Sequence, residues 1–561
     1  MAGKEAFFAD MIAYVRENRP DKRRIMTKKT EFCKKHGLNA SPTDIEILMN
    51  APKEELSFLK KYLYTKPVRT ISGVAIVAVM TKPYGCPHGR CTMCPGGINS
   101  VFGSVPNSYT GHEPATMRAI RNDYDSYLQV FNRLEQYIVL GQEPDKVDLI
   151  VMGGTFPFTP KKYQEDFVYN CFKAMNDFSK LFYRKGQFDL DAFRSFFEMP
   201  GTIGGQERVM KVREKILALK SKGVRSLEAE HSANEKAVIR CIGLTIETKP
   251  DYGKLAHGNE MLRLGCTRVE LGVQTSYDDV LTRIHRGHDL ADTFESIMQL
   301  KDLGFKINYH IMLGLPGVTQ EMDMHALHEY FDNPAFRPDM MKLYPCMVMP
   351  GTKLEQEWKD GKFIPIKTED AAKLIAEAKK FIPEYVRIMR VQRDIPTKMS
   401  SAGLDKNNLR QIVEDILKKE GRSCRCIRCR EIKGDIIKEP RIVLRSYEAS
   451  GGMEHFISVE TKDDRMVGFC RLRLPGQSLR KEITRDSAII RELHVYGSAV
   501  AIGKEGEVQH RGFGKQLMKE AERIASEAGK KKMIVISGVG VRGYYRKLGY
   551  KKQGPYMVKK L

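Results

Sequence analysis

Apolar runs of strand length alternate with helical patterns through the middle of the chain. Six such runs are GVAIVAVM (73–80), DLIVMGG (148–154), AVIRCIGLTIE (237–247), TRVELGVQ (267–274), KINYHIMLGL (306–315) and MMKLYPCMV (340–348). Apolar positions with helical spacing lie between them, most clearly at 115–140 and 278–303. This alternation is typical of a parallel sheet, so residues 66–400 are predicted to form a partial or complete (β/α) barrel of the α/β class.

The pattern changes toward the C-terminus. Short strand patterns precede a helix at 512–529, and a further strand and helix follow it. We therefore expect residues 436–561 to form a separate α+β domain. Residues 383–435 are strongly basic, and Arg387, Arg390 and Arg393 recur every third residue, as if sharing a face toward phosphates. Within this stretch we assign residues 401–435 as a connector.

Charge adds a functional indication. The 561 residues carry a formal net charge of +23, which favours a polyanionic partner such as nucleic acid. Residues 1–65 read as helical, and the segment RPDKRRIMTKKTEFCKK (19–35) holds eight Lys or Arg against two acids. A solvated helical face is the alternative, but the one-sided excess favours an RNA contact.

No apolar run approaches the length that spans a bilayer, and the first residues lack the layout of a secretory signal. We therefore expect a cytoplasmic enzyme without a membrane partner. Twelve cysteines in such a protein favour metal binding over disulfides.

The first cysteine cluster is KPYGCPHGRCTMCPGG, with Cys86, Cys91 and Cys94 in a C-x4-C-x2-C spacing after a predicted strand. Three thiolates on a glycine-rich loop can hold three irons of a [4Fe–4S] cluster and leave the fourth iron open. An open iron can chelate S-adenosylmethionine, whose reductive cleavage gives a 5′-deoxyadenosyl radical. A zinc site is the alternative, but three cysteines without a nearby fourth ligand fit structural zinc poorly.

Two further strand ends support a radical S-adenosylmethionine (SAM) barrel. Gly153, Gly154 and Thr155 follow a strand and are similar to the glycine-rich motif that receives the methionine amino group of SAM. Glu247 closes the next predicted strand, in ETKPD. Active sites of β/α barrels lie at this end of the strands. Each signal is weak alone, and the combination favours SAM binding.

The C-terminal domain carries a Q-x-x-G-x-G loop typical of GNAT acetyltransferases. Backbone N–H groups of such a loop, at a helix N-terminus, face the pyrophosphate of acetyl-coenzyme A. The preceding strand can pair with the pantetheine amides. The residues predicted to bind acetyl-coenzyme A are Gln509, His510, Arg511, Gly512 and Gly514 in the loop, and Glu492, Leu493, His494 and Val495 in the strand.

Two tyrosines after the last predicted strand are candidate catalytic residues. The hydroxyl of Tyr544 or Tyr545 can protonate the departing thiolate or bind the thioester carbonyl. We expect the functional role at Tyr545, with packing as the alternative. Glu492 and His494 are also candidate bases, although pairing within a strand explains them equally well.

The second cysteine cluster, CRCIRC, lies in the basic connector. Cys424, Cys426 and Cys429 have spacings that suit a zinc clip between two domains, and we prefer this to redox chemistry. The fourth ligand is not readable from the sequence, with Cys346 and the scattered histidines as candidates.

Together these segments resemble the catalytic, third subunit of the Elongator complex in its archaeal form, over nearly the whole chain. The matching segments include CPHGRCTMCPGG, VMGGTF, IGLTIETKPDY, HRGFGKQLM and ISGVGVRGYYRKLGY. The resemblance implies a tRNA enzyme that carboxymethylates C5 of the wobble uridine, position 34, from acetyl-coenzyme A. It also implies that Lys146 touches acetyl-coenzyme A across the interface between the domains.

Two rival functions stay open at this point. The first is a protein lysine acetyltransferase in which the barrel is a scaffold, and it leaves the basic N-terminal segment unexplained. The second is a non-catalytic RNA-binding subunit, which needs neither the cysteine loop nor the glycine loop. The oligomeric state is also open, with a homodimer or accessory subunits as the alternatives.

Overall fold

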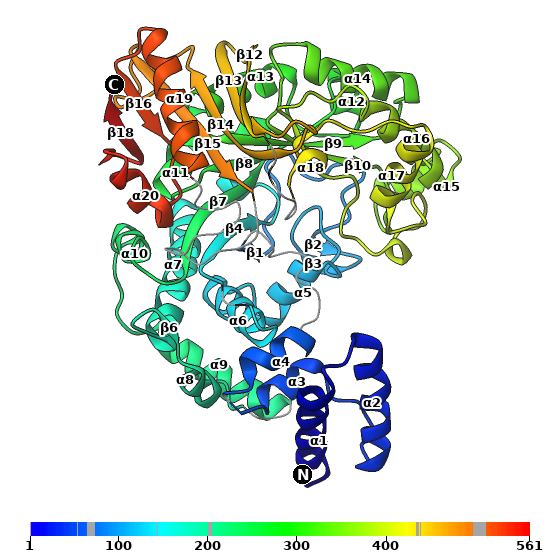
Figure 1. The fold of residues 1–561 in the computed structure, drawn as a ribbon. Coiled ribbons are helices and arrows are strands. Elements are labelled where there is room, and N and C mark those ends of the chain that lie inside the picture. The colour runs from blue at the N-terminus through cyan, green and yellow to red at the C-terminus, as the bar shows by residue number, and fades with distance from the viewer. Residues whose placement is uncertain are drawn as a thin grey trace.

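The fold is known from a computed structural model, which describes residues 2–52, 54–63, 73–142, 144–199, 205–432, 437, 439–496 and 512–561. Two sheets lie against each other in the upper part of the view in Figure 1, and a group of N-terminal helices lies below them. No helix within these ranges has the length and apolar character needed to cross a membrane.

The larger domain is built on a parallel sheet of seven described strands in the order β1-β4-β7-β8-β9-β10-β11. Their bounds are β1 (Val74–Met80), β4 (Lys146–Met152), β7 (Arg240–Thr248), β8 (Arg268–Gln274), β9 (Lys306–Leu313), β10 (Met340–Pro345) and β11 (Arg387–Arg390). Six of them are the strands predicted from the apolar runs. The open parallel sheet confirms the predicted partial barrel.

Helices connect the parallel strands, as right-handed crossovers require. They are α5 (Pro114–Arg121), α6 (Ser126–Val139), α7 (Lys161–Phe182), α8 (Leu190–Phe196), α9 (Gln206–Lys220), α10 (Leu227–Asn234), α11 (Leu255–Arg263), α12 (Asp278–Arg283), α13 (Leu290–Asp302), α14 (Gln320–Asp332), α15 (Lys353–Lys359) and α16 (Thr368–Ala378). A further helix, α17 (Leu409–Lys419), follows the last strand, β11. The helical pattern at 115–140 is two helices, because Asp123 and Tyr124 adopt positive φ between them.

The strand β11 corrects the expectation that Arg387 faces phosphates. The run Arg387–Arg390 pairs in parallel with β10, so it belongs to the sheet. The Arg387 guanidinium donates to the Tyr496 hydroxyl at 2.7 Å and forms an ion pair with Glu431 at 2.7 Å. The four residues Arg-Ile-Met-Arg resemble a basic loop in sequence, because nothing near Arg387 in the chain shows that Tyr496 and Glu431 will pair with it.

The second sheet is mixed and forms the C-terminal domain. Its order is β12-β13-β14-β15-β16-β18-β17, and only β15 and β16 pair in parallel. The elements are β12 (Arg441–Ala449), β13 (Gly452–Glu460), β14 (Met466–Leu474), β15 (Ser487–Val495), α19 (Phe513–Glu527), β16 (Lys532–Val535), η4 (Val539–Val541), α20 (Arg542–Lys547), β17 (Lys551–Gln553) and β18 (Tyr556–Lys560). The α+β expectation is confirmed, and the final hairpin is an addition.

The N-terminal helices form their own small core. They are α1 (Ala2–Asn18), α2 (Lys22–Lys35), α3 (Asp44–Met49) and α4 (Leu56–Leu63), and they bury an apolar cluster that includes Phe7, Met11 and Leu59. The Arg194 side chain of α8 donates to the backbone carbonyls of Met49 (2.7 Å) and Ala51 (3.1 Å). This contact fixes the helical unit against α8, one of the helices inserted between β4 and β7 of the larger domain (Figure 1).

The two sheets share one continuous apolar core rather than meeting at a thin surface. The turn η4 packs against the start of β7, where a Cβ added at Gly538 would lie 2.0 Å from the Ile242 carbonyl oxygen. Such a close approach admits only glycine. The two domains are therefore held in one fixed arrangement by apolar packing and by backbone contact.

Candidate functional site

The first cysteine cluster lies in the loop that follows β1, at the carboxyl edge of the parallel sheet. Hydrogen bonds hold its thiols in place. The Asn107 amide donates to the Cys86 sulfur at 2.7 Å, and the Ser108 backbone N–H donates to the Cys94 sulfur at 3.1 Å. His88 of the same loop and Arg286 lie beside the third sulfur, that of Cys91, at 3.2 and 3.8 Å. Two segments that are distant in sequence, at residues 107–108 and at Arg286, thus converge on this loop.

The electrostatics of this loop suit a metal cluster. Burial raises the pKa of the Cys94 thiol to about 11, with repulsion from Cys91 adding to the shift. Burial also raises the pKa of the Cys86 thiol. Thiols with raised pKa values become thiolates when cations bind, and iron supplies that charge. The loop therefore has the donor set for iron and needs iron to hold its sulfurs ionised.

The distances between the sulfurs distinguish a site for an iron cluster from a site for a single metal ion. Within the described residues, one group of three or more possible ligands has all its donor atoms within 4.8 Å, and it is Cys424, Cys426 and Cys429. Tetrahedral bonds of ~2.3 Å to one zinc ion place sulfurs about 3.8 Å apart. Cys86, Cys91 and Cys94 lie further apart than such a group, as thiolates bound to three different irons do.

The predicted SAM-binding glycines lie directly beside this loop. Gly153 (φ +131°) and Gly154 (φ +91°) end β4 in conformations that other residues rarely adopt. A Cβ at Gly153 would lie 2.0 Å from the Thr81 hydroxyl. The Thr155 hydroxyl is close enough to Cys86 to stabilise its thiolate. The structure therefore brings Gly153, Gly154 and Thr155 together with the cysteine loop.

Glu247 joins the same site from the end of β7. Its carboxylate accepts hydrogen bonds from the Tyr109 hydroxyl at 2.9 Å and from the Gly153 N–H at 3.3 Å. Burial raises the pKa of Glu247, and repulsion from Glu270 adds to the shift. Burial likewise raises the pKa of Tyr109 well above its usual value. A carboxylate that meets the Gly153 N–H is well placed to receive the amino group of a ligand bound on the glycine turn.

The sheet carries a charged cluster that sequence reasoning missed. Glu270 on β8 is fully buried and forms an ion pair with Lys342 on β10. It also accepts from His310 at 2.7 Å and from Asn308 at 3.2 Å, both on β9. Despite the opposing effect of burial, Lys342 and His310 hold the pKa of Glu270 well below its usual value.

Glu270 pairs in register with Glu247, so this cluster adjoins the SAM-binding residues on the inner face of the sheet. The signal for it was present in the sequence. Polar or charged side chains recur at alternate positions of RVELGVQ, KINYHIML and MMKLYP, although not at every one, which is unusual for strands of a parallel sheet.

Part of the predicted acetyl-coenzyme A loop, namely Gln509, His510 and Arg511, lies outside the described residues. Gly512 is described and adopts φ +84° at the N-cap of α19, the left-handed conformation that suits glycine. The helix α19 has 15 residues. Like every α-helix it presents free backbone N–H groups and a partial positive charge at its first turn. Gly512 and Gly514 therefore lie at a helix N-terminus that suits a pyrophosphate, the role predicted for them.

The two tyrosines differ in what surrounds their hydroxyls. A Cβ added at Gly514 would lie 3.0 Å from the Tyr544 hydroxyl and 3.8 Å from a methyl carbon of Val495. Tyr544, the helix N-terminus and the end of β15 thus meet at one point. The Tyr545 ring is buried between Tyr544 and Tyr550, with ring centroids 5.3 and 6.0 Å away. The geometry favours Tyr544 over Tyr545 as the hydroxyl that reaches a bound ligand.

The strand residues Glu492, Leu493, His494 and Val495 all pair with β14. Glu492 accepts from the Arg471 Nε at 3.0 Å. Although burial opposes ionisation, Lys306 and Arg471 hold the pKa of Glu492 below its usual value. Burial lowers the pKa of His494 to about 4, and its ring stacks on Phe469. Neither side chain is a strong base at neutral pH, so both fit the strand-pairing alternative better than general-base catalysis.

Lys146 is the first residue of β4 and lies beside Arg240 of β7 in the sheet register. Arg240 in turn packs against η4 of the C-terminal domain, because a Cβ at Gly540 would lie 2.5 Å from the Arg240 Cβ. Lys146 is thus one strand away from the domain interface. This position supports the role implied for it by resemblance.

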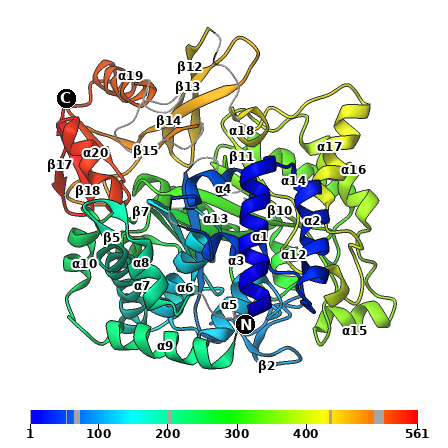
Figure 2. The same cartoon turned by 60° about the horizontal axis from the view of Figure 1, so that its bottom comes forward.

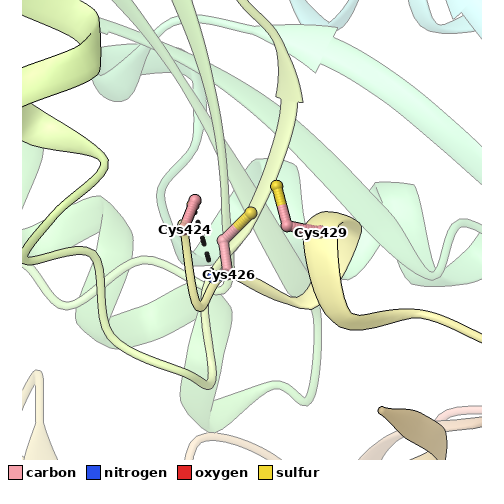
Figure 3. A group of neighbouring side chains, drawn as sticks. All are labelled: Cys424, Cys426 and Cys429. Atoms are coloured by element: carbon pink, nitrogen blue, oxygen red, sulfur yellow. Dashed lines mark hydrogen bonds between the residues drawn. The ribbon is translucent and has the colours of Figure 1, made fainter. Parts of the chain in front are cut away.

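The second cysteine cluster surrounds the start of α18 (Ile427–Arg430), and its three side chains come from this short helix and the turn before it (Figure 3). The sulfurs of Cys424, Cys426 and Cys429 lie within 4.8 Å of one another, as one tetrahedral ion requires. The Lys379 ammonium donates to the Cys429 sulfur at 3.5 Å. Cys346 packs in a different apolar cluster, with Met93 and Val348.

Four family models match successive parts of the chain. They are the ELP3 N-terminal domain (residues 8–71), the Radical SAM superfamily (80–329), the Radical SAM C-terminal domain (338–419) and the acetyltransferase (GNAT) family (426–550). The Radical SAM match implies S-adenosylmethionine and a [4Fe–4S] cluster, and the GNAT match implies acetyl-coenzyme A.

Curated relatives match nearly the whole chain. A protein of Methanocaldococcus infernus named tRNA uridine(34) acetyltransferase is 46% identical over 96% of each chain, and Elongator complex protein 3 of Homo sapiens is 41% identical over 95% of this chain and 92% of its own. A solved structure of M. infernus Elp3 lacking residues 1–46 aligns with a TM-score of 0.71 and 40% identity, covering 88% of this chain and 100% of the other. At this identity and coverage the chain belongs to the Elongator complex protein 3 family, whose archaeal members are named tRNA uridine(34) acetyltransferase.

Proposed function

We propose that this protein carboxymethylates C5 of the wobble uridine, position 34, of tRNA, with acetyl-coenzyme A as carbon donor and radical SAM chemistry. The observation that carries the proposal is the joining of two different loops in one rigid body. A cysteine loop with the donor set for iron lies on the parallel sheet, and a GNAT helix N-terminus lies on the mixed sheet that shares its core. A relative named for uridine 34 is 46% identical over 96% of this chain, so the match spans both centres.

At the first centre, Cys86, Cys91 and Cys94 would hold the cluster, with Asn107 and Ser108 orienting two of their sulfurs. Gly153, Gly154, Thr155 and Glu247 would hold SAM. Once bound and reduced, the cluster and SAM would supply a radical that removes hydrogen atoms. The chain's own contribution is to bury the Cys94 thiol and the Glu247 carboxyl, which limits the access of water to this part of the site.

The need for both centres follows from the bond that is made. The product joins C5 of uridine to the methyl carbon of acetate. That methyl group has a strong, weakly acidic C–H bond, which a side-chain base of ordinary pKa cannot ionise efficiently. The candidate bases on β15 are weaker still, since Glu492 is paired with Arg471 and His494 has a pKa of about 4. Hydrogen-atom removal from the methyl group avoids this difficulty, because the resulting carbon radical can add to C5. The adduct then releases the C5 proton and one electron, for which the oxidised iron–sulfur cluster would be the acceptor, and hydrolysis of the thioester leaves the carboxylate.

At the second centre we propose that Tyr544 acts on the thioester. Its hydroxyl lies beside Val495 at the end of β15, the strand that is expected to pair with the pantetheine arm that carries the thioester. Lys146 would contact the same ligand from the larger domain. Cys424, Cys426 and Cys429 would bind zinc, a structural ion that holds α18 against the sheet, where the Ile427 N–H donates to the Val386 carbonyl at 2.9 Å.

The rival function, protein lysine acetylation, is tested by substrate class. Purified protein is incubated with acetyl-coenzyme A, SAM and a reductant, together with either tRNA or a lysine-rich histone peptide. The proposal expects 5-carboxymethyluridine in nuclease digests of the tRNA and no acetylated peptide. Acetylated peptide without modified uridine would overturn it.

A further inference from the structure

A cavity of about 200 Å³ lies between α5, α6 and α9, on the outside of the parallel sheet. It far exceeds the ~10–15 Å³ that one water molecule occupies. Arginines dominate its lining, which includes Arg118, Arg121, Arg208 and Arg213. The walls are completed by Val209 and Val212 of α9 and by amide side chains of α6. We call it the α5–α9 pocket.

Positive charge in the pocket exceeds negative charge. Arg208 pairs with Glu135 at 3.0 Å, and Arg213 pairs with Asp123. Within the described ranges, no ion pair of Arg118 or Arg121 is found. The guanidinium of Arg133, stacked on the Tyr137 ring at 4.3 Å, adds a fifth cation next to Arg118. Five guanidinium groups therefore stand against two carboxylates.

This surplus has an energetic consequence. Burial lowers the pKa of Arg118 to about 10, and repulsion from Arg133 and Arg121 contributes to the shift. Arg118 still carries its charge at neutral pH, so the repulsion is present in the folded protein. An anion in the pocket would relieve it. Planar guanidinium groups bind phosphate oxygens in pairs, which makes phosphate the anion that such a group of arginines fits best.

We propose that the α5–α9 pocket binds a phosphate group. Two sources share this chemistry, a backbone phosphate of tRNA and a free phosphate. The RNA source rests on the proposed function. It is supported by the position of the pocket, because α9 belongs to the same insertion as α8, whose Arg194 holds the N-terminal helices. Figures 1 and 2 both show α5 and α9 on the side of the molecule that carries α3 and α4, so one RNA could reach the pocket and the basic helix α2.

The test compares the Arg118→Gln/Arg121→Gln variant of the full chain with a matched control, Lys519→Gln/Arg523→Gln on α19. The control removes two exposed charges from the opposite end of the molecule. The dissociation constant for a tRNA transcript is measured across a salt series, and inorganic phosphate is titrated calorimetrically. If RNA is the source, the log–log salt slope falls by roughly 0.7–0.9 for each phosphate that the variant no longer neutralises, and the control keeps the wild-type slope.

The remaining outcomes separate the two sources from each other and from the absence of a site. Abolished phosphate binding in the pocket variant with an unchanged RNA slope supports the pocket and identifies free phosphate as its source. An unchanged RNA slope together with unchanged phosphate binding overturns the proposal. Failure of the wild-type protein to bind tRNA at all, with phosphate binding that depends on Arg118 and Arg121, would remove the proposed function and leave the pocket standing.

Discussion

Arg491 of the C-terminal sheet and Asp339 of the barrel form a fully buried, two-point ion pair between the domains. The Arg491 Nη1 lies 2.7 Å from Asp339 Oδ2, and its Nη2 lies 2.6 Å from Oδ1. Both side chains are at most 1% exposed. Arg473 makes a parallel contact to Asp302, at 2.7 Å, with both side chains fully buried. The carboxylates of α13 and of the residue before β10 thus neutralise arginines of the other sheet.

Removing one member of this pair should destabilise the whole protein. Asp339→Asn leaves Arg491 with one buried carboxylate partner, Glu454 at 2.9 Å, instead of two, and breaking such a buried pair costs about 3–5 kcal/mol in comparable sites. We expect one unfolding transition at a clearly lower urea midpoint. Asp332→Asn, at a side chain that is 74% exposed, is the control and should leave the midpoint unchanged. Equal midpoints for both variants would show that the interface pair contributes no stability.

The same pair predicts a pH dependence. Although burial opposes ionisation, Arg491 and Arg471 hold the pKa of Asp339 well below its unfolded value of about 3.9. A depressed folded pKa means that the stabilisation is complete above the unfolded pKa and is lost as the pH falls below it. Wild-type stability should therefore decline below pH ~4 more steeply than that of Asp339→Asn.

Tyr544 and Tyr545 should separate in a kinetic comparison. Tyr544→Phe removes the hydroxyl beside Gly514 and should lower the rate of acetyl-coenzyme A turnover by about 10²–10⁴-fold if that hydroxyl transfers a proton. Tyr545→Phe keeps a buried ring in the core and should change the rate little. The opposite ranking would return the catalytic role to Tyr545, as the sequence suggested.

The second cysteine cluster should account for one zinc ion per chain. Replacing Cys426 by Ser should remove the ion, measured by elemental analysis, and lower the melting temperature, because a structural site adds its binding energy to folding. Cys346→Ala is the control, since Cys346 belongs to another apolar cluster. Zinc loss in that control would contradict a three-cysteine clip.

The basic helix α2 offers a charge test within one element. Lys22 and Lys29 both pair with Asp44, whereas Arg23 and Arg24 are exposed. Arg23→Gln/Arg24→Gln should therefore reduce the salt slope of tRNA binding by about 0.7–0.9 per neutralised phosphate, and more than Lys22→Gln/Lys29→Gln does. Equal slopes in wild type and both variants would exclude α2 from the RNA contact.

The parts of the site that could be predicted from the sequence depend on residues that lie close together along the chain. Cys86, Cys91 and Cys94 are close in sequence, and Gly153 and Gly154 carry a backbone conformation that only glycine adopts readily. The residues that were missed depend on distant partners. Glu270 becomes part of the site only because Lys342 and His310 reach it from two other strands.

The contacts between the two domains could not be predicted from the sequence for a related reason. Arg471, Arg473 and Arg491 stand in strands where charged residues usually face solvent, and nothing near them in sequence shows that Asp302 and Asp339 will bury them. The choice between Tyr544 and Tyr545 likewise depends on the position of α19, which alternation along the chain does not encode.

In the proposed reaction, the two centres of a single polypeptide remove a hydrogen atom from the acetyl methyl group and join that carbon to C5 of uridine. Acetyl-coenzyme A deuterated in the methyl group is supplied with SAM, reductant and tRNA, and deuterium is measured in the 5′-deoxyadenosine released. Cys86→Ala is the control and should release none. We predict deuterated 5′-deoxyadenosine, with a carboxymethyl group on uridine 34 that has one deuterium fewer than the donor methyl. Accumulation of modified uridine while 5′-deoxyadenosine stays unlabelled would contradict this route.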